Sequence, residues 1–288
     1  MFTGLRIGIL AMLLVVLVLT GLSGYWYFAQ TRAEHEIERQ VAALQARGGD
    51  FACADRQWQG FPLRLALVCE GTRIEFPGGP EVETAKLEAI GHLYDPRQVV
   101  AYTDEIRLAG APDWSAGARN IDVAAKMATL DRLEFSASGE ALGFANGLMP
   151  AVAVDALKVE GSLDNPPRGR QNDLAALLRE AARLGSRVTI DRFEASMADI
   201  EVTASGSVEF GPEGPTGTLE TTVSNYAQVL ADLERRGVIS RQAARGSSMV
   251  LGFLQGKTSD SEMTVSLRFH EGQVFWGPFV VADIPPLE

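Results

Sequence analysis

The chain begins with a long apolar run. Residues 7–29 contain no charged side chain, and the first half of this run is almost wholly aliphatic. At about 1.5 Å of helical rise per residue, a run of this length spans the ~30 Å hydrocarbon core of a bilayer. It ends in aromatic residues of the kind that lie at a membrane interface, namely Tyr25, Trp26, Tyr27 and Phe28. The pattern predicts a transmembrane helix.

A cleaved signal peptide is the alternative interpretation of this run. Its apolar core would be shorter, and a site with small residues should follow it. Here the bulky aromatic cluster follows instead, which favours an uncleaved signal anchor. Arg6 precedes the run without a neighbouring acid, so we expect residues 1–6 to stay in the cytoplasm. We therefore predict a single-pass protein of the bacterial inner membrane whose C-terminal domain is periplasmic.

Beyond the anchor, the period of the apolar residues changes from that of a helix to that of strands. Residues 30–48 have helical spacing and end at Gly48 and Gly49, which predicts a juxtamembrane helix. From residue 49 onward apolar and polar residues alternate, as in antiparallel strands with one buried face. The clearest alternating positions form a candidate hydrophobic groove: Leu63, Leu65, Leu67, Ile200, Val202, Val208, Phe210, Val265, Leu267 and Phe269.

Helical spacing returns only in the second half of the chain. It predicts short helices over 173–184, 226–236 and 240–254, each of which we expect to pack against the sheet. Strands do not alternate with helices, which excludes a doubly wound α/β fold. The predicted fold is mainly β (α+β): an extended, twisted or curved antiparallel sheet over 49–288, with a few helices on one side. The Pro-rich loop at 165–170 is a candidate boundary between two lobes.

The two cysteines, Cys53 and Cys69, flank a turn signal. Gly60 and Pro62 lie midway between them, so a hairpin folded at Phe61 would place one cysteine opposite the other. In an oxidising compartment this arrangement predicts a structural disulfide, and two buried thiols are the alternative. A redox or metal role is disfavoured, because there is no C-x-x-C motif and the three histidines are scattered.

Charge and motifs exclude several classes of function. The net charge is −11, from 26 basic and 37 acidic residues, and nucleic-acid binding needs a basic surface instead. The sequence has no G-x-S-x-G, S-x-x-K or H-E-x-x-H motif and no phosphate-binding loop. We expect no catalytic residue, no metal and no cofactor, and we predict that the protein is not an enzyme.

Several short segments carry a family resemblance. The anchor, the turn and strand Gly60-Phe61-Pro62-Leu63-Arg64-Leu65 with its flanking cysteines, and the terminal run from Gly272 to Pro278 resemble the alphaproteobacterial envelope family catalogued as domain of unknown function 2125. The stretch from Gly217 to Tyr226 and the later Glu271-Gly272-Gln273-Val274 are similar to AsmA-like proteins. Those are single-span, periplasmic, β-rich proteins implicated in lipid movement, so the resemblance implies a curved sheet with an apolar groove and no catalytic residues.

Two functions remain open from the sequence. The first is an inner-membrane-anchored protein that handles phospholipid or another hydrophobic ligand, which requires an apolar sheet face left uncovered by helices. The second is a non-catalytic envelope scaffold or assembly factor that binds other envelope proteins, which requires that face to be covered.

Overall fold

The computed structural model describes residues 2–77, 79–110, 114–146, 149–167, 174–225, 262–270, 272–276 and 279–283. The chain divides into two compact units, Met1–Pro112 and Asp113–Glu288. In each unit the strands are antiparallel, and their order in the sheet is their order in the chain. The predicted class is confirmed: a mainly β, antiparallel fold with one long apolar helix at the N-terminus.

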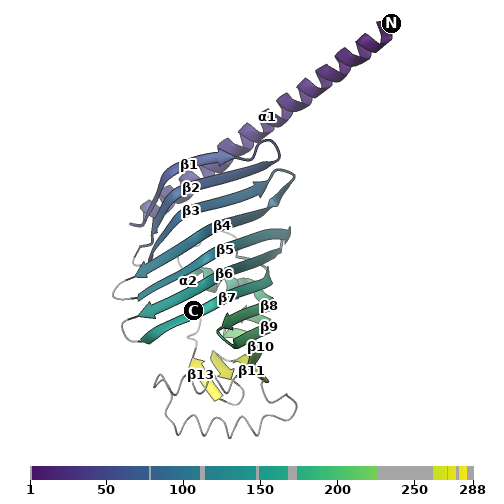
Figure 1. The fold of residues 1–288 in the computed structure, drawn as a ribbon. Coiled ribbons are helices and arrows are strands. Elements are labelled where there is room, and N and C mark those ends of the chain that lie inside the picture. The colour runs from purple at the N-terminus through teal and green to yellow at the C-terminus, as the bar shows by residue number, and fades with distance from the viewer. Residues whose placement is uncertain are drawn as a thin grey trace. The chain divides into compact units, whose positions relative to one another are not determined.

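The first unit consists of a long helix and four strands (Figure 1). Its elements are α1 (Phe2–Gln45), β1 (Asp50–Gln59), β2 (Arg64–Glu75), β3 (Glu81–His92) and β4 (Asp95–Gly110). The predicted span and juxtamembrane helix are thus one continuous helix. Gly48, at a left-handed φ of 86°, ends the turn that follows α1, and the Gly49 N–H donates to the Leu44 carbonyl.

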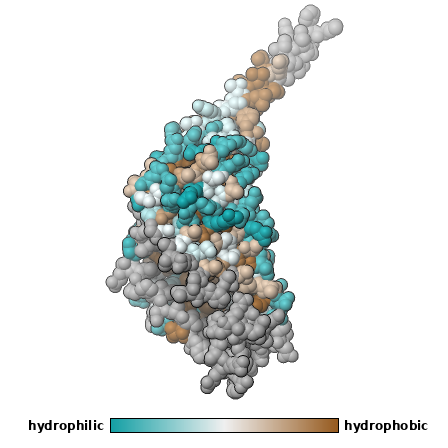
Figure 2. Space-filling view, turned by 60° about the vertical axis from the view of Figure 1, so that its left-hand side comes forward, coloured by the Kyte–Doolittle hydropathy of each residue, from teal (hydrophilic) through white to brown (hydrophobic). Residues whose placement is uncertain are grey.

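The described apolar side chains of α1, from Met12 to Leu19, are not covered by the described part of the chain. Residues 12–19 are eight consecutive apolar side chains, and each is about half exposed or more. Figure 2 shows the hydrophobic residues gathered on this helix. Leaving such a stretch in water would forfeit roughly 1.5–3 kcal/mol per large side chain, whereas a bilayer covers it. The helix is therefore suited to be a single-pass membrane anchor.

The strands of the first unit share a break in their pairing at one level of the sheet. The ladder skips Ala54 and Gly71 between β1 and β2, where Gly71 has a left-handed φ of 61°. Threonine hydroxyls donate to backbone carbonyls at this level, from Thr72 to Cys69 and from Thr84 to Lys86. The Cys69 and Lys86 carbonyls thus accept hydrogen bonds where the ladder is interrupted, and polar groups that are buried or half-buried need such partners.

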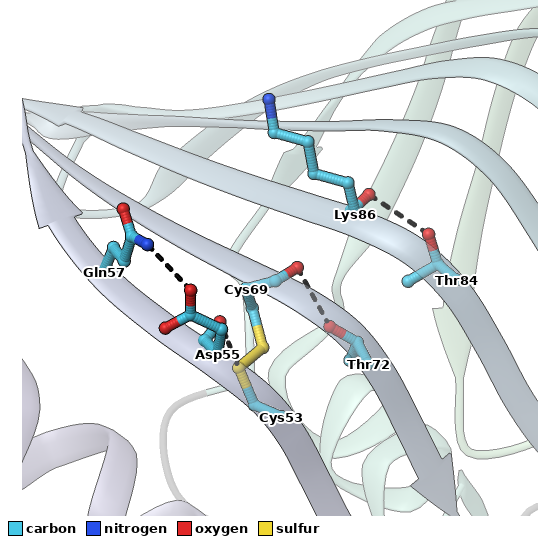
Figure 3. The surroundings of a disulfide bond; sticks show 7 residues. All are labelled: Cys53, Asp55, Gln57, Cys69, Thr72, Thr84 and Lys86. Carbon is cyan, nitrogen blue, oxygen red and sulfur yellow. Dashed lines mark hydrogen bonds between the residues drawn. A yellow bond between two sulfur atoms is a disulfide. The ribbon is translucent and has the colours of Figure 1, made fainter.

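The disulfide between Cys53 and Cys69 lies at this break (Figure 3). It is present as predicted, with a Cα–Cα distance of 5.7 Å. The predicted hairpin register is wrong, however. Cys53 is paired in register with Thr72, and Cys69 with Arg56, because the Arg64 N–H closes the turn on the Gly60 carbonyl and moves its centre past Phe61. The disulfide therefore joins two residues that are not opposite each other in the ladder, at the level where the pairing of β1 and β2 is interrupted.

The second unit contains one short helix and nine strands in its described residues. The elements before the longest gap are β5 (Trp114–Thr129), β6 (Arg132–Asn146), β7 (Met149–Asp164), α2 (Leu174–Leu184), β8 (Arg187–Met197), β9 (Ile200–Gly211) and β10 (Gly214–Ser224). Those after it are β11 (Glu262–His270), β12 (Gln273–Trp276) and β13 (Phe279–Asp283). Among the described strands of this unit, β5 and β13 are not paired with each other, so the sheet is open.

The helix α2 corresponds to the one expected over 173–184, and it packs against β9. Ala181 and Ala182 are buried, and Gly185 ends the helix at a left-handed φ of 61°. The fully buried Ser186 then donates its hydroxyl to the Asn165 carbonyl. The helices expected over 226–236 and 240–254 lie outside the described residues.

The division between the units lies earlier than the loop at 165–170 that the sequence suggested. The strands on either side of that loop, β7 and β8, are paired along most of β8. The connection through α2 therefore leaves strand pairing continuous, which explains why a Pro-rich loop there does not separate two units.

Candidate hydrophobic ligand surface

The second unit brings apolar residues from successive strands into rows that run across its sheet. In one row Leu133, Leu163, Val188 and Val208 are neighbours from β6 to β9. In the next, Phe135 faces Gly161, and Ile190 and Leu219 lie on either side of Gly206. Because side chains on neighbouring strands in register point to the same side of a sheet, these rows form one continuous surface. We call it the apolar face of the second unit.

The register places seven of the predicted groove residues on this face. They come from β9 and β11, and β10 lies between them. For example, Val223 pairs with Val202 on one side and Met263 on the other, and Leu219 pairs with Leu267. The seven are Ile200, Val202, Val208, Phe210, Val265, Leu267 and Phe269, and all are half-buried. The strand alternation in the sequence therefore identified their shared side correctly.

The other three predicted groove residues belong to the first unit. Leu65 and Leu67 are half-buried, whereas Leu63 is 55% exposed in the turn before β2. The most buried apolar side chains of β2 include Ala66 and Val68, which alternate with the leucines. Both sides of β2 are thus partly covered.

Sequence reasoning did not single out the residues that join the two predicted strands. Leu219 and Val223 on β10, and Phe135, Ile190 and Phe193 on β6 and β8, continue the apolar rows. Their segments alternate less clearly, because threonine, glycine or alanine occupies several of the apolar positions, for instance Thr221 between Ala204 and Val265. The apolar face of the second unit is therefore wider than the sequence indicated.

The apolar face is only partly covered. In the described part of the second unit, the buried apolar residues include Ala181 and Ala182 on α2, Pro215 at the start of β10 and Val274 on β12. The large side chains in the rows of β6, β8, β9 and β11 are half-buried, and Val123 on β5 is exposed. A surface of this kind can bind acyl chains by removing apolar area from water, without specific polar partners.

The opposite face of the same sheet is polar. Lys158 Nζ lies 2.8 Å from Glu160, and Arg192 approaches Glu194 at 3.7 Å. The hydrogen bond and the positive charge of Lys158 lower the pKa of Glu160, and Arg192 adds to this effect. All four side chains are well exposed, so these pairs keep the face hydrated and contribute little to stability.

An open depression of about 570 Å³ lies on this polar face, lined by residues that include Asn120, Asp122, Glu140, Lys158 and Glu194. Among its carboxylates, Glu140 accepts a hydrogen bond from the Asn120 amide at 2.7 Å, and Glu194 lies 3.7 Å from Arg192. Across the described ranges, no three His, Cys, Asp or Glu side chains gather in a way that could hold a metal ion.

The predicted interface residues lie on α1 where its apolar stretch ends. Tyr25, Tyr27 and Phe28 are exposed. Trp26 differs from them, because its ring packs edge-on against Phe61 in the β1–β2 turn with the centroids 6.0 Å apart. The aromatic end of the helix is thus joined to the first hairpin.

Comparison with known proteins identifies a family. No curated protein sequence matches the chain. The profile of domain of unknown function 2125 (DUF2125), described as an uncharacterised protein conserved in bacteria, matches residues 26–111 and 103–285. The first match starts at the aromatic end of the anchor and ends where the first unit ends. Since the two matches together cover most of the sequence, the chain belongs to the DUF2125 family.

Proposed function

We propose that this protein is a membrane-anchored, non-catalytic protein that binds phospholipid or a similar hydrophobic ligand on the apolar face of its second unit. The observation that carries the proposal is the run of half-buried apolar rows across β6 to β11 on an open sheet. The anchor would hold this surface beside a membrane. The likeness to AsmA-like proteins, the inner-membrane location and the periplasmic orientation belong to the same proposal.

The energetics of acyl-chain burial support such a role. Each methylene removed from water contributes about 0.8 kcal/mol, so covering about ten methylenes corresponds to micromolar affinity. No polar group on the ligand has to be matched for this gain. The rows described above are several side chains long in each direction, which suits a chain-like ligand better than a compact one.

A charged residue in the middle of the apolar face is expected to abolish ligand retention. Val208→Asp places a carboxylate between Val188 and Gly217, where an acyl chain would have to desolvate it. We expect the milder Val208→Thr to lose part of the ligand. Ser205→Asp is the matched control, because Ser205 is exposed on the other face of β9.

The measurement is lipid recovery after release from the anchor. A protease site inserted in the exposed turn at 46–48, combined with Trp26→Ala to remove the contact of α1 with the first hairpin, would separate the remainder of the chain from α1 without detergent. Organic extraction and mass spectrometry then count lipid per chain, with circular dichroism and thermal melting confirming that each variant is folded. Lipid retained by wild type and Ser205→Asp but lost in Val208→Asp supports the proposal. A folded wild-type protein without lipid contradicts it and favours the protein-binding scaffold.

A further inference from the structure

The first hairpin is fixed to the anchor at a defined position along the helix. The Trp26 indole N–H donates to the Arg64 carbonyl at 3.0 Å, and its ring packs against Phe61. Both contacts involve the β1–β2 turn or the first residue of β2. The turn must therefore lie at the depth of Trp26, wherever α1 places that residue.

That depth is the membrane interface if α1 spans a bilayer. Trp26 follows Leu19, the last of the consecutive exposed apolar residues, by two helical turns, which is about 10 Å along the axis. Tyr25, Tyr27 and Phe28 surround it in the sequence, and Trp and Tyr concentrate at the headgroup level of membranes. The polar remainder of α1 continues beyond this level to Gln45.

The turns at this depth expose large apolar and aromatic side chains. Phe61 is 51% exposed and Leu63 is 55% exposed. The β3–β4 turn lies against the same place, because the Leu93 N–H donates to the Leu63 carbonyl at 3.0 Å, and its Tyr94 is 72% exposed. Such side chains, clustered on two turns, are costly in water and favourable at an interface.

The flanking charges suit the same environment. Arg64 follows the first turn, and Asp95 and Arg97 follow the second; both arginines are exposed. Basic side chains beside an inserted apolar cluster are attracted to anionic lipid headgroups. The chain as a whole is acidic, so these two arginines are opposite in sign to the net charge of the protein.

We propose that the β1–β2 and β3–β4 turns insert Phe61, Leu63 and Tyr94 into the interfacial layer of the bilayer that α1 crosses, and so hold the first unit against the membrane surface. The inference rests on α1 being a membrane span, which is part of the proposed function. It does not require the second unit to bind lipid. Its partner is the phospholipid bilayer itself.

The test is quenching of a fluorophore by labelled lipid in the full chain. The structure contains no free cysteine, so one introduced cysteine can carry a nitrobenzoxadiazole label while the disulfide stays oxidised. Phe61→Cys and Tyr94→Cys are the test positions. Phe76→Cys is the matched control, because Phe76 is 45% exposed just past the opposite end of β2. Leu17→Cys, within the apolar stretch of α1, reports whether the helix spans the bilayer.

Each protein would be reconstituted in vesicles of phosphatidylethanolamine and phosphatidylglycerol that contain a phosphatidylcholine with a shallow doxyl quencher or, for the Leu17→Cys variant, with a deep doxyl quencher. We expect quenching at positions 61 and 94 to exceed that at 76 several-fold. If position 17 is quenched but position 61 or 94 is quenched no more than position 76, the inference is overturned, although α1 still spans the bilayer. Absence of quenching at 17 overturns the membrane anchor and, with it, this inference.

Discussion

Gly206→Ala is expected to destabilise the second unit by about 3 kcal/mol or more, because the sheet leaves no room for a side chain there. Gly206 has a φ of 145°, which a residue with a Cβ rarely adopts. A Cβ at this position would lie 2.2 Å from the Thr218 carbonyl oxygen and 2.9 Å from the Leu219 Cα. Both obstacles are backbone atoms of β10, so the strand pairing itself would have to move.

Gly143→Ala is the matched control for this prediction. Gly143 lies on β6 of the same unit, and a Cβ there would meet no atom within 4 Å. We expect its effect to be neutral or slightly stabilising, since alanine restricts the unfolded chain more than glycine does. Urea unfolding of both variants, followed by circular dichroism and limited proteolysis, measures the difference. Equal unfolding midpoints for the two variants would contradict the close approach of the β9 and β10 backbones at Gly206.

Removing the disulfide is expected to destabilise the first unit by roughly 3 kcal/mol, the chain-entropy value for a loop of this size. Cys53 and Cys69 are 16 residues apart in sequence, and Cys69 is almost fully buried. The crosslink restrains β1 and β2 at the level where their ladder is interrupted, so few backbone hydrogen bonds can substitute for it. The change is the double variant Cys53→Ala/Cys69→Ala, which avoids leaving a buried thiol unpaired.

Thermal melting of the double variant and of the reduced wild-type protein should give the same lowered midpoint. Reductant should have no further effect on the double variant, which serves as the control for nonspecific action. Alkylation and mass spectrometry would establish that both thiols are free after reduction. An unchanged midpoint for fully reduced wild type would mean that the disulfide does not stabilise the first unit.

The parts of the fold that the sequence predicted best are those with a clean periodicity. The uncharged run from residue 7 and the glycines at 48 and 49 placed the long helix, because both signals are local. The strict alternation over 200–210 and 263–269 placed seven residues on one side of a sheet, because the side-chain period of a strand is fixed at two. Neither inference required knowledge of strand pairing.

The features that the sequence missed depend on pairing between strands. The hairpin register differed by three residues because the turn is not centred on Phe61, and no local pattern reveals where the Arg64 N–H will close it. The role of Leu219 became visible only when β10 was seen to pair with both β9 and β11. The contact of Trp26 with Phe61 likewise joins residues that lie far apart in the sequence.

The central claim is that the apolar face of the second unit contacts lipid, and photocrosslinking on β10 tests it most directly. Benzoylphenylalanine would replace Leu219 on the apolar face or, as control, the exposed Thr218 on the other face of the same strand. After irradiation of the full chain in bacterial membranes, mass spectrometry would identify the adducts. We predict phospholipid adducts at position 219 several-fold above those at 218. Equal lipid labelling at the two positions, or adducts at 219 with protein alone, would contradict it.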